Sequence, residues 1–330
     1  MNYLTIIDII RKGENNTRYL VQNHIGDFYS ILAKTGTYGI GDTINEDEVL
    51  LLEAKKNWVD NYQKGQSYPR KEMMSHLIAY KTLSLRNNEK GFYNNTEYEH
   101  IFTSPEQNLL RGFGYDTALL EQLSTIREKG ELRSDFTHLT SSQAFAVNFI
   151  SPLIAENKLF YLDPCFADSD YKNCEFEKIV DTGEETQFDF YAAGLSGKPS
   201  CSIEVKYSEN EFGATFADPR HVDKYAAEYD GYMHQLASVE QKQYSFFEYY
   251  QIWRNLIYTV KENGQHICFL FPAFRKDLKA AVKTIIAKCK EEYKPFIHIL
   301  IADEIAERII ELDEKLSPYY KELKKKYFFE

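Results

Sequence analysis

The sequence predicts an α/β fold in which a mixed central sheet is flanked by helices on both faces. Three observations indicate this fold: a helix followed by three strands from about residue 140, then a second helix, then a further strand. The segment before residue 136 mixes polar and aromatic residues, and its periodic segments indicate helices. We therefore expect a mostly helical accessory region over residues 1–135, of unknown role, and an α/β domain over residues 136–330.

The accessory region contains three segments with helical periodicity. Apolar residues recur near helical spacing, with charged residues between them, over residues 46–63, 71–85 and 117–129. Turn-rich pieces separate these segments. The pattern predicts three helices in this region.

The α/β domain is expected to begin with a helix that hydroxyl side chains cap at Thr140, Ser141 and Ser142. Three strand-like segments follow at residues 176–181, 187–192 and 202–207, with Gly-containing turns between them. After an insertion at about 208–243, the pattern predicts a helix over 244–261 and a strand over 267–271. A helix from residue 275, a strand at 296–301 and a helix at 304–316 complete the domain.

Charged residues lie on two of the three neighbouring strands. Asp189 lies on the second strand, and Glu204 and Lys206 lie on the third. Because side chains alternate along a strand, Glu204 and Lys206 point to one face. Two carboxylates can hold Mg²⁺, and an ammonium can position a water or stabilise negative charge on a phosphate. The pattern therefore suggests hydrolysis of phosphodiester bonds.

The spacing of an acid and a lysine is not diagnostic by itself. It recurs at eight other places, for example at Glu53 and Lys55. The copy at Glu204 differs because it interrupts an apolar strand and follows a strand that carries Asp189. The structural alternative is a solvent-facing ion pair of Glu204 with Lys206, and an Asp189 that ends a hairpin.

Composition restricts the class of protein. A chain of 330 residues with 43% hydrophobic residues can bury a substantial core. No run of eighteen apolar residues and no signal-peptide pattern occurs, so we expect a cytoplasmic protein without a membrane segment. The five cysteines are odd in number and widely spaced, which indicates reduced, buried thiols without a zinc motif or disulfide framework.

The formal net charge of −11 argues against a nucleic-acid partner, because backbone binding relies on Lys and Arg. The charge is unevenly distributed, however. Residues 163–189 carry nine acids against two lysines, beside the proposed metal site. Residues 275–294 carry seven basic residues against three acids, so a basic surface remains locally.

The order of elements, with Phe188-Asp189 on the second strand and Glu204-Val205-Lys206 on the third, resembles the PD-(D/E)xK nuclease superfamily. More narrowly, residues 141–144, 186–189, 203–209 and 212–213 resemble a bacterial group of restriction-endonuclease-like proteins. The resemblance covers about residues 140–302. It implies a restriction-endonuclease-like core and an endonuclease that cleaves DNA in restriction or genome defence.

The resemblance also implies roles for individual residues. Asp189 and Glu204 would bind Mg²⁺, with Mn²⁺ as a substitute, and Lys206 would orient the attacking water or stabilise the developing phosphate charge. Gln251, on the helix after the third strand, corresponds to a glutamine in several nuclease branches. Gln143 stands on the first helix, where many relatives have a metal-binding glutamate, so the number of metals stays open.

Other residues are candidates for substrate contact. Gln143 is one, and Lys276, Lys279 and Lys283 line one side of an amphipathic helix that could contact the DNA backbone. A solvated outer face is the alternative for the lysines. Double-strand cutters of this fold often act as dimers, so the resemblance implies a homodimer as well as DNA as a partner.

Two other functions remain open. One is a binding module on the same fold, for nucleic acid or protein, that has lost catalysis. Intact Asp189, Glu204 and Lys206 argue against it, whereas the acidic composition and the missing glutamate argue for it. The other is an enzyme that acts on RNA or on free nucleotides.

Overall fold

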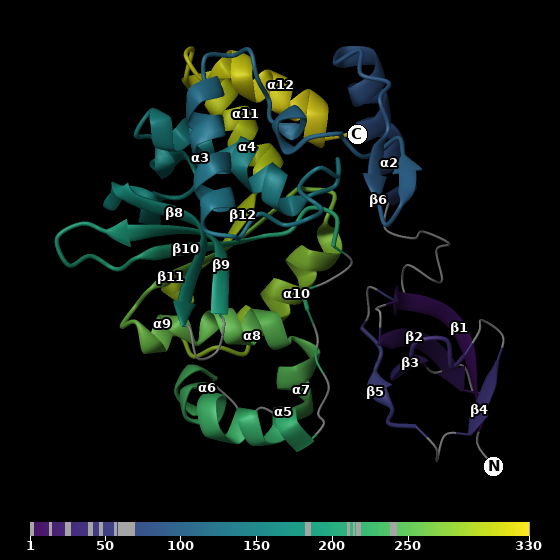
Figure 1. Ribbon diagram of the computed structural model, residues 1–330. Helices are drawn as coiled ribbons and strands as arrows, with labels where there is room; N and C mark the ends of the chain where they lie inside the picture. The colour runs from purple at the N-terminus through teal and green to yellow at the C-terminus, as the bar shows by residue number, and fades with distance from the viewer. Residues whose placement is uncertain are drawn as a thin grey trace. The chain divides into compact units, whose positions relative to one another are not determined.

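The structure is a computed structural model. It describes residues 3–12, 15–23, 28–38, 42–45, 49–55, 58, 70–181, 186–209, 212–213, 215, 219–237 and 243–329. The chain divides into two compact units, Met1–Arg70 and Lys71–Glu330 (Figure 1). The division thus lies after Arg70, whereas the sequence suggested residue 135. The physical reason is that the helices after Arg70 pack with the second unit, where Tyr80 donates a 2.9 Å hydrogen bond to Glu322.

The first unit is a five-stranded antiparallel sheet in the order β4-β1-β2-β3-β5. Its strands are β1 (Tyr3–Lys12), β2 (Asn16–Asn23), β3 (Phe28–Lys34), β4 (Thr43–Asn45) and β5 (Leu52–Glu53). Alternate residues such as Leu4 and Ile6, or Tyr19 and Val21, form its core. A spacing of two is typical of a half-buried strand.

The prediction of a mostly helical accessory region is therefore wrong for residues 3–53. The expected helix over 46–63 contains strand β5 at Leu52–Glu53, and most of the rest of it lies outside the described residues. The other two predicted helices are present but belong to the second unit. They are α2 (Arg70–Ala79), which continues into the π-helical turn η2 (Tyr80–Ser84), and α3 (Asp116–Glu128).

The second unit is built around a mixed five-stranded sheet in the order β12-β11-β10-β9-β8 (Figure 1). Strands β8 (Ser169–Asp181), β9 (Thr186–Gly194) and β10 (Cys201–Val205) form the expected antiparallel meander. Strands β11 (His266–Phe271) and β12 (Ile297–Ile301) continue the sheet in parallel with β10. The expected mixed sheet with helices is thus present. A separate hairpin joins β6 (Gly91–Tyr93) and β7 (Thr96–Tyr98).

Helices cover both faces of this sheet (Figure 1). Helices α3, α4 (Ser142–Ala155), α11 (Ala302–Leu312) and α12 (Ser317–Tyr327) lie on one side, and α8 (Tyr250–Leu256), α9 (Tyr258–Lys261) and α10 (Lys276–Ile286) lie on the other. The helix predicted over 244–261 is three successive short helices, of which α7 (Gln243–Glu248) is the first. The final predicted helix ends earlier, at Leu312, because Pro318 in the first turn of α12 starts a new helix.

The described residues of the insertion after β10 are largely helical. It contains α5 (Pro219–Lys224), the π-helical turn η6 (Tyr225–Tyr229) and α6 (Asp230–Leu236). Aromatic rings attach it to the domain core, since Tyr225 and Tyr229 pack edge-on or tilted against Phe246 at 4.7 and 5.1 Å between ring centroids. The insertion therefore forms part of the layer that covers α8.

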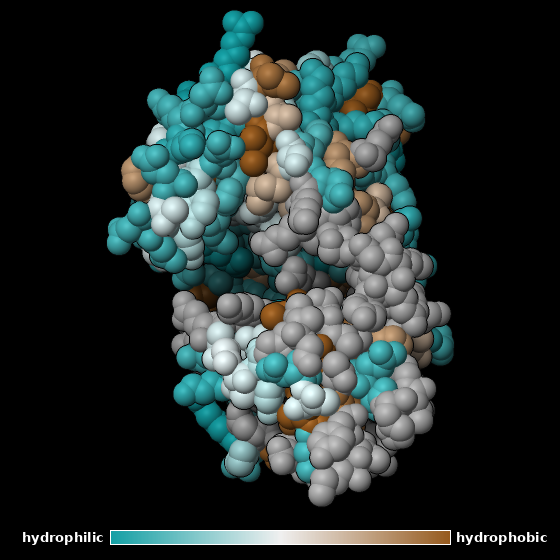
Figure 2. Space-filling model, turned by 90° about the vertical axis from the view of Figure 1, so that its right-hand side faces the viewer, coloured by the Kyte–Doolittle hydropathy of each residue, from teal (hydrophilic) through white to brown (hydrophobic). Residues whose placement is uncertain are grey.

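Large hydrophobic side chains are exposed singly among the described residues. Figure 2 shows hydrophobic residues on one face as scattered spots among hydrophilic ones. Exposed large hydrophobic residues such as Leu83, Phe92 and Leu312 come from separate elements. In the described part of the chain, no helix has the length and apolar character needed to cross a membrane.

Candidate active site

Three acids meet where the meander strands run side by side. Strands β9 and β10 pair Phe190 with Ile203, so Glu204 lies across from Asp189. Paired residues of antiparallel strands share a face, which brings these two carboxylates together. On the other side of β9, the register of β8 places Glu177 across from Asp189. The three acids therefore form a row across β8, β9 and β10.

The row is almost inaccessible to solvent. The exposed fractions are 3% for Glu177, 4% for Asp189, 3% for Glu204 and 8% for Lys206. Burying charges at this density is costly unless each is paired and hydrogen-bonded. The contacts of each carboxylate therefore show what the site is arranged to hold.

Glu204 is surrounded by donors from two directions. Lys206 Nζ lies 2.8 Å from its Oε1, and Gln251 Nε2 donates to the same oxygen at 2.6 Å. Asn255, one turn after Gln251 on α8, donates to Oε2 at 3.0 Å. The backbone N–H of Gly213 donates to Gln251 Oε1 at 3.1 Å, which fixes the amide orientation. The solvent-facing ion pair considered from sequence is thus wrong in one respect: the Glu204–Lys206 pair exists but is buried.

Asp189 and Glu177 share one guanidinium. Arg133 Nη2 lies 3.0 Å from Asp189 Oδ1 and 3.2 Å from Glu177 Oε2. The second oxygen of Asp189 accepts the backbone N–H of Val205 at 2.6 Å, which attaches β9 to the end of β10. The Arg133 side chain is 42% exposed, so it lies between the buried carboxylates and solvent.

Gln143 lies beside the acidic row, and its side-chain hydrogen bonds go to neighbouring protein groups. Its Nε2 donates to Glu177 Oε1 at 2.7 Å and to the carbonyl of Glu131 at 3.0 Å. Its Oε1 accepts the backbone N–H of Arg133 at 3.0 Å. Because Gln143 is only 1% exposed, its contacts place Arg133 and Glu177 and leave it little access to a substrate.

The electrostatics of the site follow from burial and from the neighbouring charges. Burial and the adjacent Glu204 carboxylate raise the pKa of Asp189 well above its ordinary value, although Arg133 opposes this. Burial also raises the pKa of Glu177, against the opposing effect of Arg133. Burial alone would lower the pKa of Lys206, but Glu204, Glu209 and Asp189 outweigh it and raise that pKa, so the ammonium stays protonated.

Glu209 is a fourth carboxylate beside the row. Its Oε2 accepts the backbone N–H of Tyr207 at 2.9 Å. Burial raises its pKa, but Lys206 and the Ser142 hydroxyl outweigh that effect and lower it, so Glu209 is an anion.

The donor set of the site suits a hard divalent cation. Four carboxylates, Glu177, Asp189, Glu204 and Glu209, surround two cationic side chains, Lys206 and Arg133. With all four carboxylates ionised, two negative charges would remain uncompensated in a buried place, which agrees with the raised pKa values of Asp189 and Glu177. The two positive charges of Mg²⁺ or Mn²⁺ would compensate them, and both ions prefer carboxylate oxygens. The residues present therefore fit a divalent ion held by Asp189 and Glu204.

The sequence predicted one site for Asp189, Glu204, Lys206 and Gln251, and the structure brings these four residues together. It did not predict Arg133 and Glu177, which also lie there. Glu177 has a backbone φ of +52°, a left-handed conformation that is uncommon for a residue with a side chain. That local geometry cannot be read from sequence. Arg133 precedes α4 in an irregular segment, where no periodicity indicates the direction of a side chain.

The lysines proposed for substrate contact lie on α10. Its apolar residues Leu278 and Val282 are buried, as the amphipathic pattern predicted, while Lys276 and Lys283 are exposed and Lys279 is partly exposed. The buried Arg275 donates to the carbonyl of Tyr207 at 3.1 Å. The start of α10 is thus attached next to Lys206. Substrate contact by the lysines stays a prediction.

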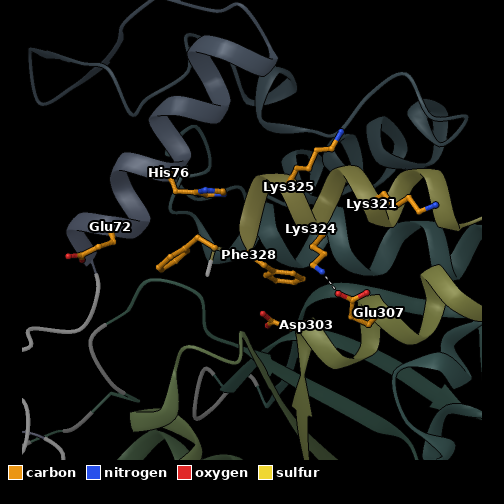
Figure 3. A pocket seen from close by; sticks show the side chains of 9 residues that line it. Glu72, His76, Asp303, Glu307, Lys321, Lys324, Lys325 and Phe328 are labelled. Carbon is orange, nitrogen blue, oxygen red and sulfur yellow. Dashed lines mark hydrogen bonds and ion pairs between the residues drawn. The ribbon is translucent and has the colours of Figure 1, made fainter.

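A pocket of about 660 Å³ lies elsewhere, between α2, α11 and α12 (Figure 3). Basic and acidic side chains line it together, and Lys324 is paired with Glu307. Its lining includes His76 and Phe328 but none of the four carboxylates described above. The pocket is therefore separate from the acidic row.

Comparison with known families and proteins gives one match. The model of the family described as Restriction Endonuclease associating with ARP matches residues 74–328, which contain the whole acidic row. Comparison with curated proteins and with solved structures gave no match. Since the match spans most of the chain and includes both the sheet and the site, this chain belongs to the family of restriction endonucleases associating with ARP.

Proposed function

We propose that this chain is a metal-dependent endonuclease of the PD-(D/E)xK type, which hydrolyses phosphodiester bonds of DNA in restriction or genome defence. The supporting observation is the meeting of Asp189, Glu204 and Lys206 on adjacent strands, with Glu177 and Arg133 beside them. Membership in a restriction endonuclease family supports a nuclease role.

Asp189 and Glu204 would hold Mg²⁺ or Mn²⁺ in this proposal. When bound, a divalent cation stabilises charge on a phosphoryl oxygen and lowers the pKa of its water. Lys206 keeps its proton, because its pKa is raised by Glu204, Glu209 and Asp189 against the effect of burial. It therefore acts as a fixed cation that orients water or stabilises phosphate charge, and not as the base. Gln251 holds the Glu204 carboxylate in place.

The buried position of the site requires an access route for the substrate. Arg133 is the half-exposed group over the carboxylates, and guanidinium groups bind phosphate well. Movement of Arg133 from Asp189 to a DNA phosphate would open the carboxylates to a cation. Lys276, Lys279 and Lys283 on α10 would contact the DNA backbone on the same side as Lys206.

A second candidate function is a binding module without catalysis. The observation that favours it is that both oxygens of Asp189 and of Glu204 already have protein partners. In an inactive protein these contacts would be permanent, and Arg133 would take the place of the cation. The two candidates differ in whether a divalent cation changes what the protein does to DNA.

The deciding experiment uses supercoiled plasmid, linear single-stranded DNA and single-stranded RNA, each with Mg²⁺, Mn²⁺ or EDTA. Wild type is compared with Lys206→Ala and with Lys198→Ala, whose lysine is 62% exposed and precedes β10, whereas Lys206 follows the end of that strand. We expect metal-dependent DNA cleavage by wild type and Lys198→Ala, and a loss of about 10²–10³ in rate for Lys206→Ala.

Three results would contradict the proposal. Cleavage that survives in folded Lys206→Ala would show that the activity arises at another site or from a contaminant. Metal-independent DNA binding without cleavage in any metal would favour the binding module, and cleavage of RNA alone would change the substrate.

A further inference from the structure

A second cluster of metal-binding side chains lies on the same sheet. Strand register pairs Cys201 with His266 and Cys268 with His298, so these four residues lie on one face. Cys165 joins them from η5 (Pro164–Phe166), a 3₁₀ turn that follows α4. The sequence shows no zinc motif, because these segments are far apart along the chain. The five cysteines are free thiols in the structure; three are buried, as predicted, whereas Cys165 and Cys174 are half-buried.

Three of these side chains are close enough to bind one ion. A ligand atom from each of Cys165, His266 and His298 lies within 4.8 Å of the other two. His266 Nδ1 and His298 Nε2 are 2.8 Å apart. Two nitrogens bound tetrahedrally to zinc are roughly 3.4 Å apart, given bond lengths of about 2.0–2.1 Å. Small movements of the two rings would therefore admit the ion.

Asp163 orients one of the two histidines. Its Oδ2 lies 3.3 Å from His298 Nδ1, while its Oδ1 accepts the backbone N–H of Cys165 at 3.0 Å. A carboxylate that accepts the Nδ1 proton leaves the Nε2 lone pair free for a metal, an arrangement common to zinc-binding histidines. Asp163 thus positions both His298 and the loop that carries Cys165.

This cluster is distinct from the acidic row. Along β10, Cys201 and Glu204 are three residues apart, about 10 Å at the usual rise per residue. An odd separation also directs their side chains to opposite faces. The acidic row lies toward the end of β10 that leads to Lys206, whereas the cluster lies at the start of β10 and β11.

We propose that Cys165, His266 and His298 bind one zinc ion, with Asp163 as the positioning residue and water as the fourth ligand. Thiolate and imidazole ligands favour zinc over magnesium, and three protein ligands leave one coordination position open. On binding, the Cys165 thiol gives its proton to solvent and its sulfur bonds to the metal. The ion would link the turn after α4 to strands β11 and β12.

The test uses the purified full-length protein, reduced and freed of metal with a chelator. Co²⁺ replaces Zn²⁺ as a coloured probe, and Zn²⁺ binding is followed by competition. We expect one thiolate-bound Co²⁺ per chain, seen as a charge-transfer band that Cys165→Ser removes. His298→Ala should weaken binding at least 100-fold, and Asp163→Asn should weaken it by about 10–100-fold.

Two matched controls separate this site from others. His234→Ala removes an exposed histidine on α6 and should leave Co²⁺ binding unchanged. Asp189→Asn removes an acid of the proposed active site and should leave the Co²⁺ band unchanged. Loss of the band in Asp189→Asn, or its persistence in folded Cys165→Ser, would overturn the proposal. So would the absence of Co²⁺ binding by folded wild type, whether or not the protein cleaves DNA.

Discussion

Asp189 is a buried acid with a raised pKa, and this has a consequence for stability. Burial and Glu204 raise its pKa well above the ordinary 3.8, so the folded chain keeps a proton there that the unfolded chain has lost. Between the two pKa values the folded state binds more protons, and stability therefore falls as pH rises through that window. Glu177 contributes in the same direction. The acidic row is therefore expected to lower the stability of the folded chain as pH rises through that window.

The substitution Asp189→Asn tests this cost. We expect it to raise the free energy of unfolding by about 1–2 kcal/mol at neutral pH and to flatten its decline from mildly acidic to neutral pH, while abolishing cleavage. Denaturant unfolding across that pH range, without metal, measures the effect. Asp168→Asn is the control, since Asp168 is 63% exposed. A variant less stable than wild type at every pH would mean that the bonds from Arg133 and Val205 outweigh the repulsion.

Replacement of Arg133 is expected to lower the free energy of unfolding, whereas Asp189→Asn is expected to raise it. In Arg133→Gln, Asp189 and Glu177 lose their shared cation, which costs about 1–3 kcal/mol in metal-free protein. The same loss leaves the carboxylates open, so Mn²⁺ should raise the melting temperature of the variant more than that of wild type. Thermal unfolding in EDTA and in Mn²⁺ measures both effects. Arg111→Gln, which removes a 52% exposed arginine, should resemble wild type. An unchanged response to Mn²⁺ would contradict competition between Arg133 and the cation.

At the residue scale, the sequence predicted the part of the site that follows from strand alternation. Glu204 and Lys206 are two residues apart on one strand, and Asp189 lies on the neighbouring strand, so one register brings them together. Arg133 could not be predicted, because its position depends on an irregular segment. Glu177 lies on the first predicted strand, and the pairing of that strand with the next was the signal that places it across from Asp189, although its positive φ interrupts the regular alternation. The Cys165, His266 and His298 cluster escaped for a similar reason: only the packing of a turn against two parallel strands unites it.

At the element scale, helix α4 carries a proline in its interior. Pro152 has no N–H for the carbonyl of Asn148, four residues earlier, which loses its usual helical partner. The hydroxyl of Tyr319 on α12 donates to that carbonyl at 2.7 Å. Tyr320 donates to the next carbonyl, that of Phe149, at 2.6 Å. Helix α12 therefore supplies the hydrogen bond that the proline removes.

This compensation can be measured by a double-mutant cycle. Tyr319→Phe leaves the Asn148 carbonyl buried without a donor and should cost about 1–3 kcal/mol. Tyr320→Phe is the matched control and should cost less, because the Phe149 carbonyl keeps its helical donor. Adding Pro152→Ala to Tyr319→Phe restores an N–H and should recover part of the lost free energy of unfolding. Equal costs for Tyr319→Phe and Tyr320→Phe, together with strict additivity of Tyr319→Phe and Pro152→Ala, would refute the compensation. Denaturant unfolding gives all the required free energies.

Elements of the second unit were easier to predict than those of the first. The meander and the later strands are apolar runs bounded by turns, and the structure places strands there with shifted ends. The prediction for the first unit is wrong because helical periodicity at 46–63, 71–85 and 117–129 was extended to the whole of residues 1–135. The alternation of Leu4 with Ile6 and of Tyr19 with Val21 was the signal for strands. The separate helix α12 was also missed, although the Ser317-Pro318 start was a usable signal.

At the scale of the whole molecule, residues 71–135 are part of the second unit. Asn108 accepts from Lys326 through its carbonyl and side-chain oxygens, at 2.6 and 2.8 Å. Burial lowers the pKa of Lys326 to about 7. The two acceptors on Asn108 replace the water that this buried amino group lacks. Asn148 also depends on this segment, because it donates to the Asn108 carbonyl and accepts the Leu110 N–H. The segment thus completes the polar contacts of α4 and α12.

These contacts predict different fates for two truncated chains. A fragment of residues 71–330 keeps Asn108, Arg133 and the whole family match, so we expect cooperative unfolding and the metal-dependent cleavage of the full chain. A fragment of residues 136–330 would leave Lys326 without its two acceptors on Asn108 and the side-chain oxygen of Asn148 without the Leu110 N–H, and it would remove Arg133. Each unsatisfied buried group costs about 1–3 kcal/mol, enough together to exceed the stability of an ordinary domain once the packing of α3 is also lost. Circular dichroism, thermal unfolding and plasmid cleavage compare the two with the full chain. Cooperative unfolding of the shorter fragment would show that the core starts at residue 136 after all, and failure of the longer one would show that the first sheet is needed for folding.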